Sequence, residues 1–178
     1  NNGPANKGQE MNEKISSLTD LRSAILFITI LPAGKNVAYS PMGMIRFFPV
    51  VGLIIGALLV IFDLAVSQLW ASPVAALLDL LFLVAVTGAF HLDGLGDTAD
   101  GIFSHRPRER ALEIMKDSHI GVYGVVGLTC ILGLQAALYG QLAAQSLWPI
   151  LGVMALSRAM MVPLMTALPN ARGKGLSA

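Results

Sequence analysis

The stretch that decides the fold class is Ile45–Leu69, IRFFPVVGLIIGALLVIFDLAVSQL. It exceeds the ~20 apolar residues needed to cross a bilayer, and its only charged residues are Arg46 and Asp63. Over all 178 residues, 54% are hydrophobic and 13% are charged, against roughly 45–50% and about 25% in soluble domains. Both observations indicate a membrane protein.

Three further stretches are long enough to span: Pro73–Phe90, Ile120–Ala144 and Leu147–Leu168. The run Ala24–Ala33 is too short, so an interfacial or re-entrant helix is expected there. In lipid, each span must satisfy its own backbone polar groups, which favours helices. We therefore predict an all-α, polytopic helical bundle with about four transmembrane helices and one short N-terminal helix.

The N-terminal residues, beginning NNGPANKGQE, are polar and lack apolar periodicity. We expect residues 1–19 to form a flexible tail. Residues 20–178 are expected to form the membrane-embedded domain.

Lysine and arginine residues predict the orientation. Cations lie at or before the start of the first expected span, between the second and third, and after the fourth: Lys7, Lys14, Arg22, Lys35, Arg46, Arg106, Arg108, Arg110, Lys116, Arg172 and Lys174. The two short connections, ASP and AQS, carry none. Because cytoplasmic loops are enriched in positive charge, both ends and residues 91–118 are expected on the cytoplasmic side.

The chemically distinctive segment is HLDGLGDTADGIFSHRPRERALEIMKDSHIG, residues 91–121. Asp93, Asp97 and Asp100 are spaced by four and then three residues, which places them within about 60° on one helical face. Unpaired carboxylates so close repel one another, and a hard cation such as magnesium or manganese would remove the repulsion. The alternative is a solvated polar helix whose acids balance the arginines that follow.

A second polar stripe comes next. Arg110, Glu113 and Asp117 have helical spacing, Lys116 is adjacent, and Arg106 lies one turn earlier. Basic groups beside a metal suit a phosphate-bearing substrate. A surface helix with ion pairs explains the same pattern.

His91 and Arg158 are also candidates. His91 lies at the expected membrane boundary, where it would bind phosphate or simply hydrogen-bond at the interface. Arg158 lies mid-span, where a cation costs at least ~2.5 kcal/mol, so Asp63, Asp79 or a bound phosphate is its expected partner. The remaining histidines are expected to be loop residues.

HLDGLGDTADG followed by RERALEIMKDSHIGVYG resembles the signature of the cobalamin synthases, the adenosylcobinamide-GDP ribazoletransferases. FFPVVG at 47–52, SR at 157–158 and TILP at 29–32 resemble further family features, so the similarity runs from about residue 20 to the end. Family members continue with more apolar helices after the position of NARGKGLSA, so the chain is expected to be incomplete at its C-terminus.

The resemblance implies a multi-pass enzyme of the bacterial inner membrane that joins adenosylcobinamide-GDP to α-ribazole or its 5′-phosphate and releases GMP. It implies magnesium on Asp93, Asp97 and Asp100. From its position at the end of the cluster, Asp100 is the expected base, and Asp97 is also expected to be catalytic. Its substrate-facing set would be Arg110, Glu113, Lys116, Asp117 and Ser118, to which we add His91 and Arg158. Expected partners are these substrates, the lipid bilayer and further copies of the chain as a homo-oligomer, with no nucleic acid.

Two other functions fit an acidic cluster in a membrane protein. A CDP-alcohol phosphatidyltransferase also uses aspartates on membrane helices, but its pattern places an Ala-Arg pair soon after the first Asp-Gly, and here no arginine follows until Arg106. A transporter or channel would place its acids near the bilayer midplane, whereas these begin where an expected span ends. The transferase is the favoured interpretation.

Overall fold

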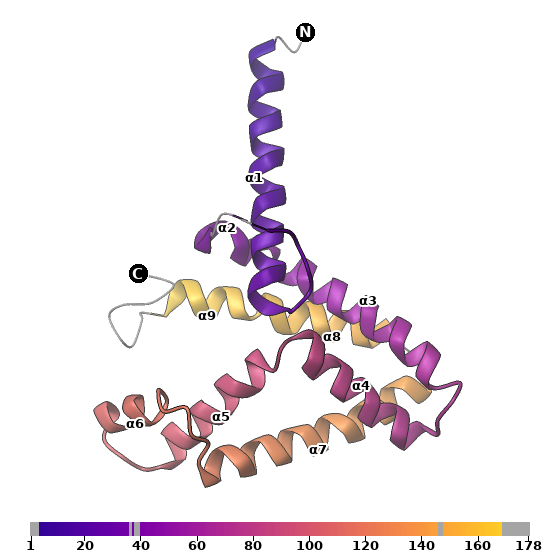
Figure 1. The fold of residues 1–178 in the computed structure, drawn as a ribbon, viewed down its shortest axis with the longest axis vertical. Helices are drawn as coiled ribbons and strands as arrows, with labels where there is room; N and C mark the ends of the chain where they lie inside the picture. Colours follow the sequence, from indigo (N-terminus) through magenta and orange to yellow (C-terminus); the bar gives the residue numbers. More distant parts are fainter. Residues whose placement is uncertain (1–3, 36, 38–39, 146–147, 169–178) are drawn as a thin grey trace. The chain divides into compact units, whose positions relative to one another are not determined.

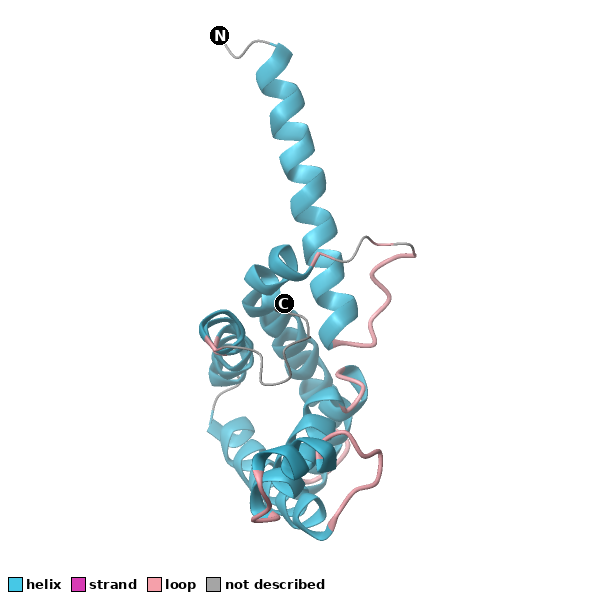
Figure 2. Cartoon of the chain, turned by 90° about the vertical axis from the view of Figure 1, so that its left-hand side faces the viewer, coloured by secondary structure: helices cyan, strands magenta, loops and turns pink. Residues whose placement is uncertain are grey.

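The computed structural model describes residues 4–35, 37, 40–145 and 148–168 (Figure 1). Its elements in chain order are α1 Pro4–Ile28, α2 Pro41–Met44, the 3-10 helix η1 Ile45–Phe47, α3 Phe48–Val66, α4 Ser72–Val86, α5 Phe90–Phe103, α6 Arg108–Ile114, α7 Val122–Gln145, α8 Trp148–Ala159 and α9 Met161–Ala167. No strand occurs within these described residues (Figure 2). The all-α prediction is confirmed.

Among the residues that the structure describes, three helical segments are long and apolar enough to cross a membrane: Pro41–Val66, Val122–Gln141 and Trp148–Ala167. The pair α4 and α5 meets the same criterion only together, with a bend of 91° between the two helices. The polytopic prediction is therefore confirmed, with a fourth span if the bent pair counts as one. The expected second span, Pro73–Phe90, is α4, which ends at Val86.

The bend between α4 and α5 has a local cause. The Thr87 hydroxyl donates a hydrogen bond to the Leu83 carbonyl at 2.9 Å, within the last turn of α4. Gly88 and Ala89 then both take left-handed backbone conformations, with φ of 59° and 57°. Such angles end a right-handed helix. The acidic segment consequently starts a new helix in a new direction.

The N-terminal region contains a helix that was not predicted, while the flexibility expected of residues 1–19 stays a prediction. Helix α1 begins at Pro4 and includes most of residues 1–19, whereas residues 1–3 lie outside the described part. Lysine, glutamate, glutamine and methionine favour helix even where no apolar periodicity is present. A prediction based on periodicity therefore did not include this helix. In the run Ala24–Ala33, α1 ends at Ile28 and the chain then leaves the helix.

The described contacts divide the chain into two compact units, residues 1–60 with 148–178, and residues 61–147. In the first unit, α3 and α8 approach closely at a glycine. A Cβ atom at Gly52 would meet the Met154 carbonyl oxygen and lie 2.8 Å from the Cα of Ala155. The Arg46 guanidinium also pairs with the buried Asp20 carboxylate at 2.5 Å, which ties α1 to η1.

The second unit contains α4, α5, α6 and α7. Helix α7 lies alongside both α4 and α5 (Figure 1). The rings of Phe62 and Phe82 stack with their centroids 4.3 Å apart, and Tyr139 of α7 is buried. The backbone amides of Gly121 and Gly124 donate hydrogen bonds to the Asp100 carboxylate, so the start of α7 meets the last turn of α5.

Candidate functional site

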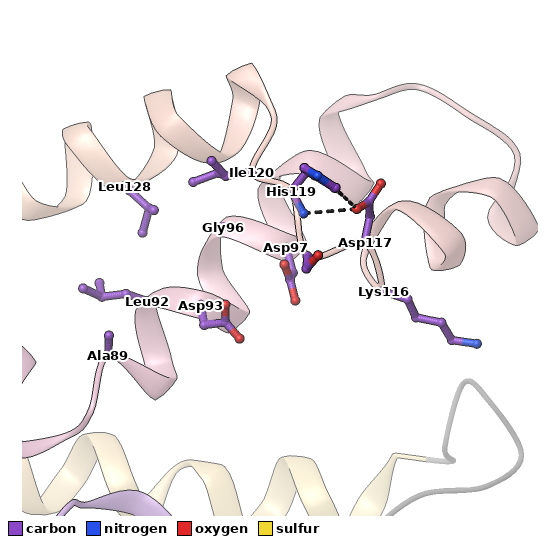
Figure 3. A pocket seen from close by; sticks show the side chains of 11 residues that line it. Ala89, Leu92, Asp93, Gly96, Asp97, Lys116, Asp117, His119, Ile120 and Leu128 are labelled. Carbon is purple, nitrogen blue, oxygen red and sulfur yellow. Dashed lines mark hydrogen bonds and ion pairs between the residues drawn. The ribbon is translucent and has the colours of Figure 1, made fainter.

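An open cavity of about 530 Å³ lies in the second unit, beside the N-terminal half of α5. Its apolar wall includes Leu92, Ile120 and Leu128. Its polar lining consists of Asp93, Asp97, Lys116, Asp117, Ser118 and His119 (Figure 3). The cavity thus combines carboxylates, a hydroxyl, an ammonium group and an imidazole with an apolar surface.

Helix α5 supplies the first two aspartates of the predicted triad. Asp93 and Asp97 lie one helical turn apart, and both line the cavity. Asp93 is exposed and Asp97 is half-buried. The helical spacing therefore brings these two carboxylates to one face, as predicted.

Asp100, the third member, has different surroundings. It is 7% exposed, and its carboxylate accepts hydrogen bonds from the backbone N–H groups of Gly121 at 2.7 Å and Gly124 at 2.8 Å. Both of its oxygens are thereby engaged in the contact between α5 and α7. The structure does not place Asp100 in the lining of the cavity, so its roles as metal ligand and base stay predictions that this geometry does not favour.

The expected helical stripe Arg110–Asp117 is interrupted, and the prediction that Asp117 shares a helical face with Arg110 and Glu113 is wrong. Helix α6 ends at Ile114, and the amides of Lys116 and Asp117 donate to carbonyls three residues back, at 3.0 Å each. Asp117 follows as a turn residue whose side chain accepts from the His119 amide at 3.1 Å. Aspartate and serine compete with helix through such local bonds. Lys116, Asp117 and Ser118 follow the end of this helix and line the cavity.

The turn carries a paired acid and imidazole. The His119 Nδ1 atom lies 2.6 Å from Asp117 Oδ1 (Figure 3). The hydrogen bond from His119 lowers the pKa of the Asp117 carboxyl, and the same hydrogen bond raises the pKa of His119. Both side chains are well exposed, so the pair is a surface contact at the rim of the cavity.

The other predicted substrate residues lie outside the lining of this cavity. Arg110 pairs with Glu113 at 2.6 Å, with both side chains more than half exposed. The half-buried His91 ring makes an edge contact with the Phe90 ring, 5.5 Å between centroids. Arg158 belongs to the first unit, where it is buried and donates to the Ser157 hydroxyl at 2.7 Å. The substrate roles of these residues stay predictions.

Arg158 was also expected to pair with Asp63 or Asp79, which belong to the second unit. Those two aspartates are both buried. The expected pairing with Arg158 stays a prediction.

Sequence reasoning missed two features of the site. His119 was expected to be only a loop residue, yet it lines the cavity and pairs with Asp117. Gly121 and Gly124 bind the Asp100 carboxylate through their backbones. The Asp-Ser-His sequence, rich in turn-forming side chains, is a signal that would have found the first. The second depends on a contact between distant segments and left no local signal.

The cobalamin-5-phosphate synthase family model matches residues 20–178. The chain belongs to this family. No solved structure matches it.

Curated proteins named adenosylcobinamide-GDP ribazoletransferase are similar to this family member. One from Klebsiella pneumoniae (strain 342) is 43% identical over 132 residues, which cover 72% of this chain and 54% of the relative. One from Roseiflexus sp. (strain RS-1) is 42% identical over 137 residues, 72% of this chain and 51% of the relative. One from Bradyrhizobium diazoefficiens is 40% identical over 171 residues, 90% of this chain and 64% of the relative. The chain thus spans about half to two thirds of the length of these relatives.

The cavity of this cobalamin-5-phosphate synthase family member can be tested against the expected magnesium. Within the described residues, no group of three or more His, Cys, Asp or Glu side chains is placed to hold a metal ion. Magnesium, however, is commonly bound by one or two carboxylates together with substrate phosphates and water. Asp93 and Asp97 supply two hard oxygen ligands in an open cavity. The donor set therefore fits a magnesium ion that is bound jointly by the protein and a phosphate-bearing substrate.

Proposed function

We propose that the cavity lined by Asp93, Asp97 and Lys116 is the site of a magnesium-dependent transferase. The reaction joins adenosylcobinamide-GDP to α-ribazole, or to its 5′-phosphate, and gives adenosylcobalamin or its phosphate with release of GMP. Membership of the cobalamin-5-phosphate synthase family and the names of the relatives support this proposal. The single observation that carries it is one open cavity that combines two carboxylates on α5 with a lysine and a serine hydroxyl from the turn after α6.

The chemistry requires neutralisation of a pyrophosphate. The ribose hydroxyl oxygen of the ribazole attacks the phosphorus attached to cobinamide, a new P–O bond forms, and the P–O bond to GMP breaks with its electron pair leaving on GMP. Lys116 is among the residues that line the cavity, and its ammonium group would offset the charge on the phosphates. A magnesium ion on Asp93 and Asp97 would supply electrostatic stabilisation of the phosphate oxygens.

The hydroxyl proton needs an acceptor, and the cavity carboxylates are the candidates. Asp100 is a poor one, because both of its oxygens already accept backbone hydrogen bonds and the side chain is buried. Asp117 is weakened as a base, because the hydrogen bond from His119 lowers its pKa. Asp93 and Asp97 therefore remain as the proposed acceptors in the cavity.

The position of the site suits its proposed substrates. The cavity lies where the bent pair α4–α5 turns by 91°, and its wall is partly apolar. A water-soluble nucleotide would enter from the aqueous side, and the large corrinoid would rest on the apolar surface. By the distribution of lysine and arginine, we propose that this side is the cytoplasmic face of the bacterial inner membrane.

The test supplies the full-length protein in membranes with adenosylcobinamide-GDP, α-ribazole 5′-phosphate and magnesium, and follows GMP. The expected result is magnesium-dependent release of one GMP for each corrinoid joined. Parallel assays contain a CDP-linked lipid and an alcohol acceptor instead. Turnover of the CDP-linked lipid with no GMP release would overturn the proposal and identify a phosphatidyltransferase.

A further inference from the structure

Asp100 occupies the contact between the last turn of α5 and the first turn of α7. Its carboxylate receives the N–H groups of Gly121 and Gly124, which flank the start of α7 at Val122. The first amides of a helix have no partner within it, and the helix dipole favours an anion at this end. Asp100 therefore acts as the N-terminal cap of α7, although it belongs to another helix.

The two glycines make this cap sterically feasible. A Cβ atom at Gly121 would meet Asp100 Oδ1 and lie 2.8 Å from its Cγ. A Cβ atom at Gly124 would meet Asp100 Oδ2 and lie 3.1 Å from the same Cγ. Any side chain at either position would push the carboxylate away from the backbone amides that donate hydrogen bonds to it. The contact thus requires the aspartate and a glycine at each of the two positions.

The cap connects the two parts of the cavity lining. Asp100 lies on α5 one turn beyond Asp97, and Gly121 directly follows the lining segment 116–120. The same carboxylate therefore ties the helix that carries Asp93 and Asp97 to the end of the turn that carries Lys116, Asp117 and Ser118. Loss of the bond would free this segment from α5 at its C-terminal end.

We propose that Asp100 is a positioning residue, which holds segment 116–120 beside Asp93 and Asp97, and not a metal ligand or base. This inference rests on the proposed function for its effect on turnover, but the contact itself is testable without activity. Asp97 acts on the phosphates or their metal, whereas Asp100 acts through the backbone of Gly121 and Gly124. The two aspartates should therefore fail in different ways when each is changed to asparagine.

The experiment combines amide hydrogen exchange with kinetics on the full-length protein. In Asp100→Asn, the side-chain NH₂ cannot accept from one of the two amides, so exchange at Gly121 and Gly124 should quicken about tenfold or more, the scale of one hydrogen bond to a charged group. Turnover should fall, while the magnesium concentration for half-maximal rate stays within about twofold of wild type. Asp97→Asn should raise that magnesium concentration and leave exchange at the two glycines unchanged.

Glycine variants test the same contact without removing any polar group. Gly124→Ala should reproduce the faster exchange and the loss of turnover, because its Cβ displaces the Asp100 carboxylate. Gly133→Ala is the matched control on α7, since a Cβ there meets nothing within 4 Å in the described structure. The double variant Asp100→Ala with Gly124→Ala should lose no more turnover than the more severe of the two single variants. Both substitutions break the same contact, so their effects should not add.

The outcomes separate the two proposals. If Asp100→Asn raises the magnesium requirement as Asp97→Asn does, and exchange at Gly121 and Gly124 is unchanged, then Asp100 is a ligand and the positioning role is overturned. Additive losses in the double variant would also contradict it. If wild type releases no GMP, the proposed function fails, while faster exchange in Asp100→Asn and Gly124→Ala would still establish the cap.

Discussion

The His119 imidazole lies 2.6 Å from the Asp117 carboxylate at the rim of the acidic cavity. The same Asp117 oxygen accepts the His119 backbone N–H at 3.1 Å. These two hydrogen bonds lie within the turn that follows α6, and both residues line the cavity together with Asp93 and Asp97. The shape of this rim should therefore depend on the protonation of the pair.

The pair predicts a defined pH window. Asp117 has its pKa lowered from an ordinary 3.8, so its contribution is present above 3.8 and is lost as pH falls through the lowered value. His119 has its pKa raised from an ordinary 6.5, so its contribution is present below 6.5 and is lost as pH rises through the raised value. The ion pair should be complete between these two ordinary values. NMR titration of the His119 ring should show a midpoint above 6.5.

Asp117→Asn is the variant that isolates this effect. It removes the charge that stabilises the imidazolium, so the His119 midpoint should fall toward its ordinary value. His105, which is exposed and lies outside the cavity, serves as the internal reference. An unchanged His119 midpoint in Asp117→Asn would show that the pair does not form in solution.

Two exposed cations of the same segment should differ in their effect on substrate. Lys116 lines the cavity, whereas Arg110 is paired with Glu113 outside it. Lys116→Ala should raise KM for adenosylcobinamide-GDP about tenfold or more, because a hydrogen bond between charged groups contributes about 1.5–3 kcal/mol. Arg110→Ala should change KM less than about threefold. Steady-state GMP release measures the KM of both variants. A larger increase in KM for Arg110→Ala than for Lys116→Ala would indicate that the phosphates bind at α6.

The close approach of α3 and α8 predicts a packing defect. In Gly52→Ala the new Cβ would meet the backbone of Met154 and Ala155, which cannot rotate away as a side chain can. The expected loss is about 1–3 kcal/mol in the free energy of unfolding, seen as a lower Tm in detergent. Gly152→Ala on α8 is the control, because a Cβ there has nothing within 4 Å in the described residues. Equal Tm values for the two variants would contradict the helix contact.

The sequence predicted the elements of this fold better than their ends. The apolar run Ile45–Leu69 is found as a helical segment over Pro41–Val66, because lipid allows few alternatives to a helix. The bend after Val86 was missed, because it depends on two successive left-handed residues, one of which is Ala89. The helix over residues 4–19 was missed for another reason, since propensity without periodicity is a weak signal.

The candidate site was also predicted only in part. Helical spacing predicted that Asp93 and Asp97 share a face, and the structure places both in one cavity. Spacing also grouped Asp100 with them, but its partners, Gly121 and Gly124, lie more than twenty residues along the chain. Periodicity measures only which residues share a face. It does not show which of these residues is buried by a segment distant in the sequence, as Asp100 is by the start of α7.

The central claim is that Asp97 supports magnesium-dependent transfer, and Asp97→Asn tests it most directly. The measurement is GMP release from adenosylcobinamide-GDP over a range of magnesium concentrations, with membrane insertion checked in parallel. Glu109→Gln, which neutralises an exposed carboxylate on α6 outside the cavity, is the control. The account predicts a loss of roughly a hundredfold or more for Asp97→Asn, in keeping with the several kcal/mol that a catalytic metal contributes, and near-normal turnover for Glu109→Gln. Normal, magnesium-dependent turnover by a correctly inserted Asp97→Asn protein would contradict it.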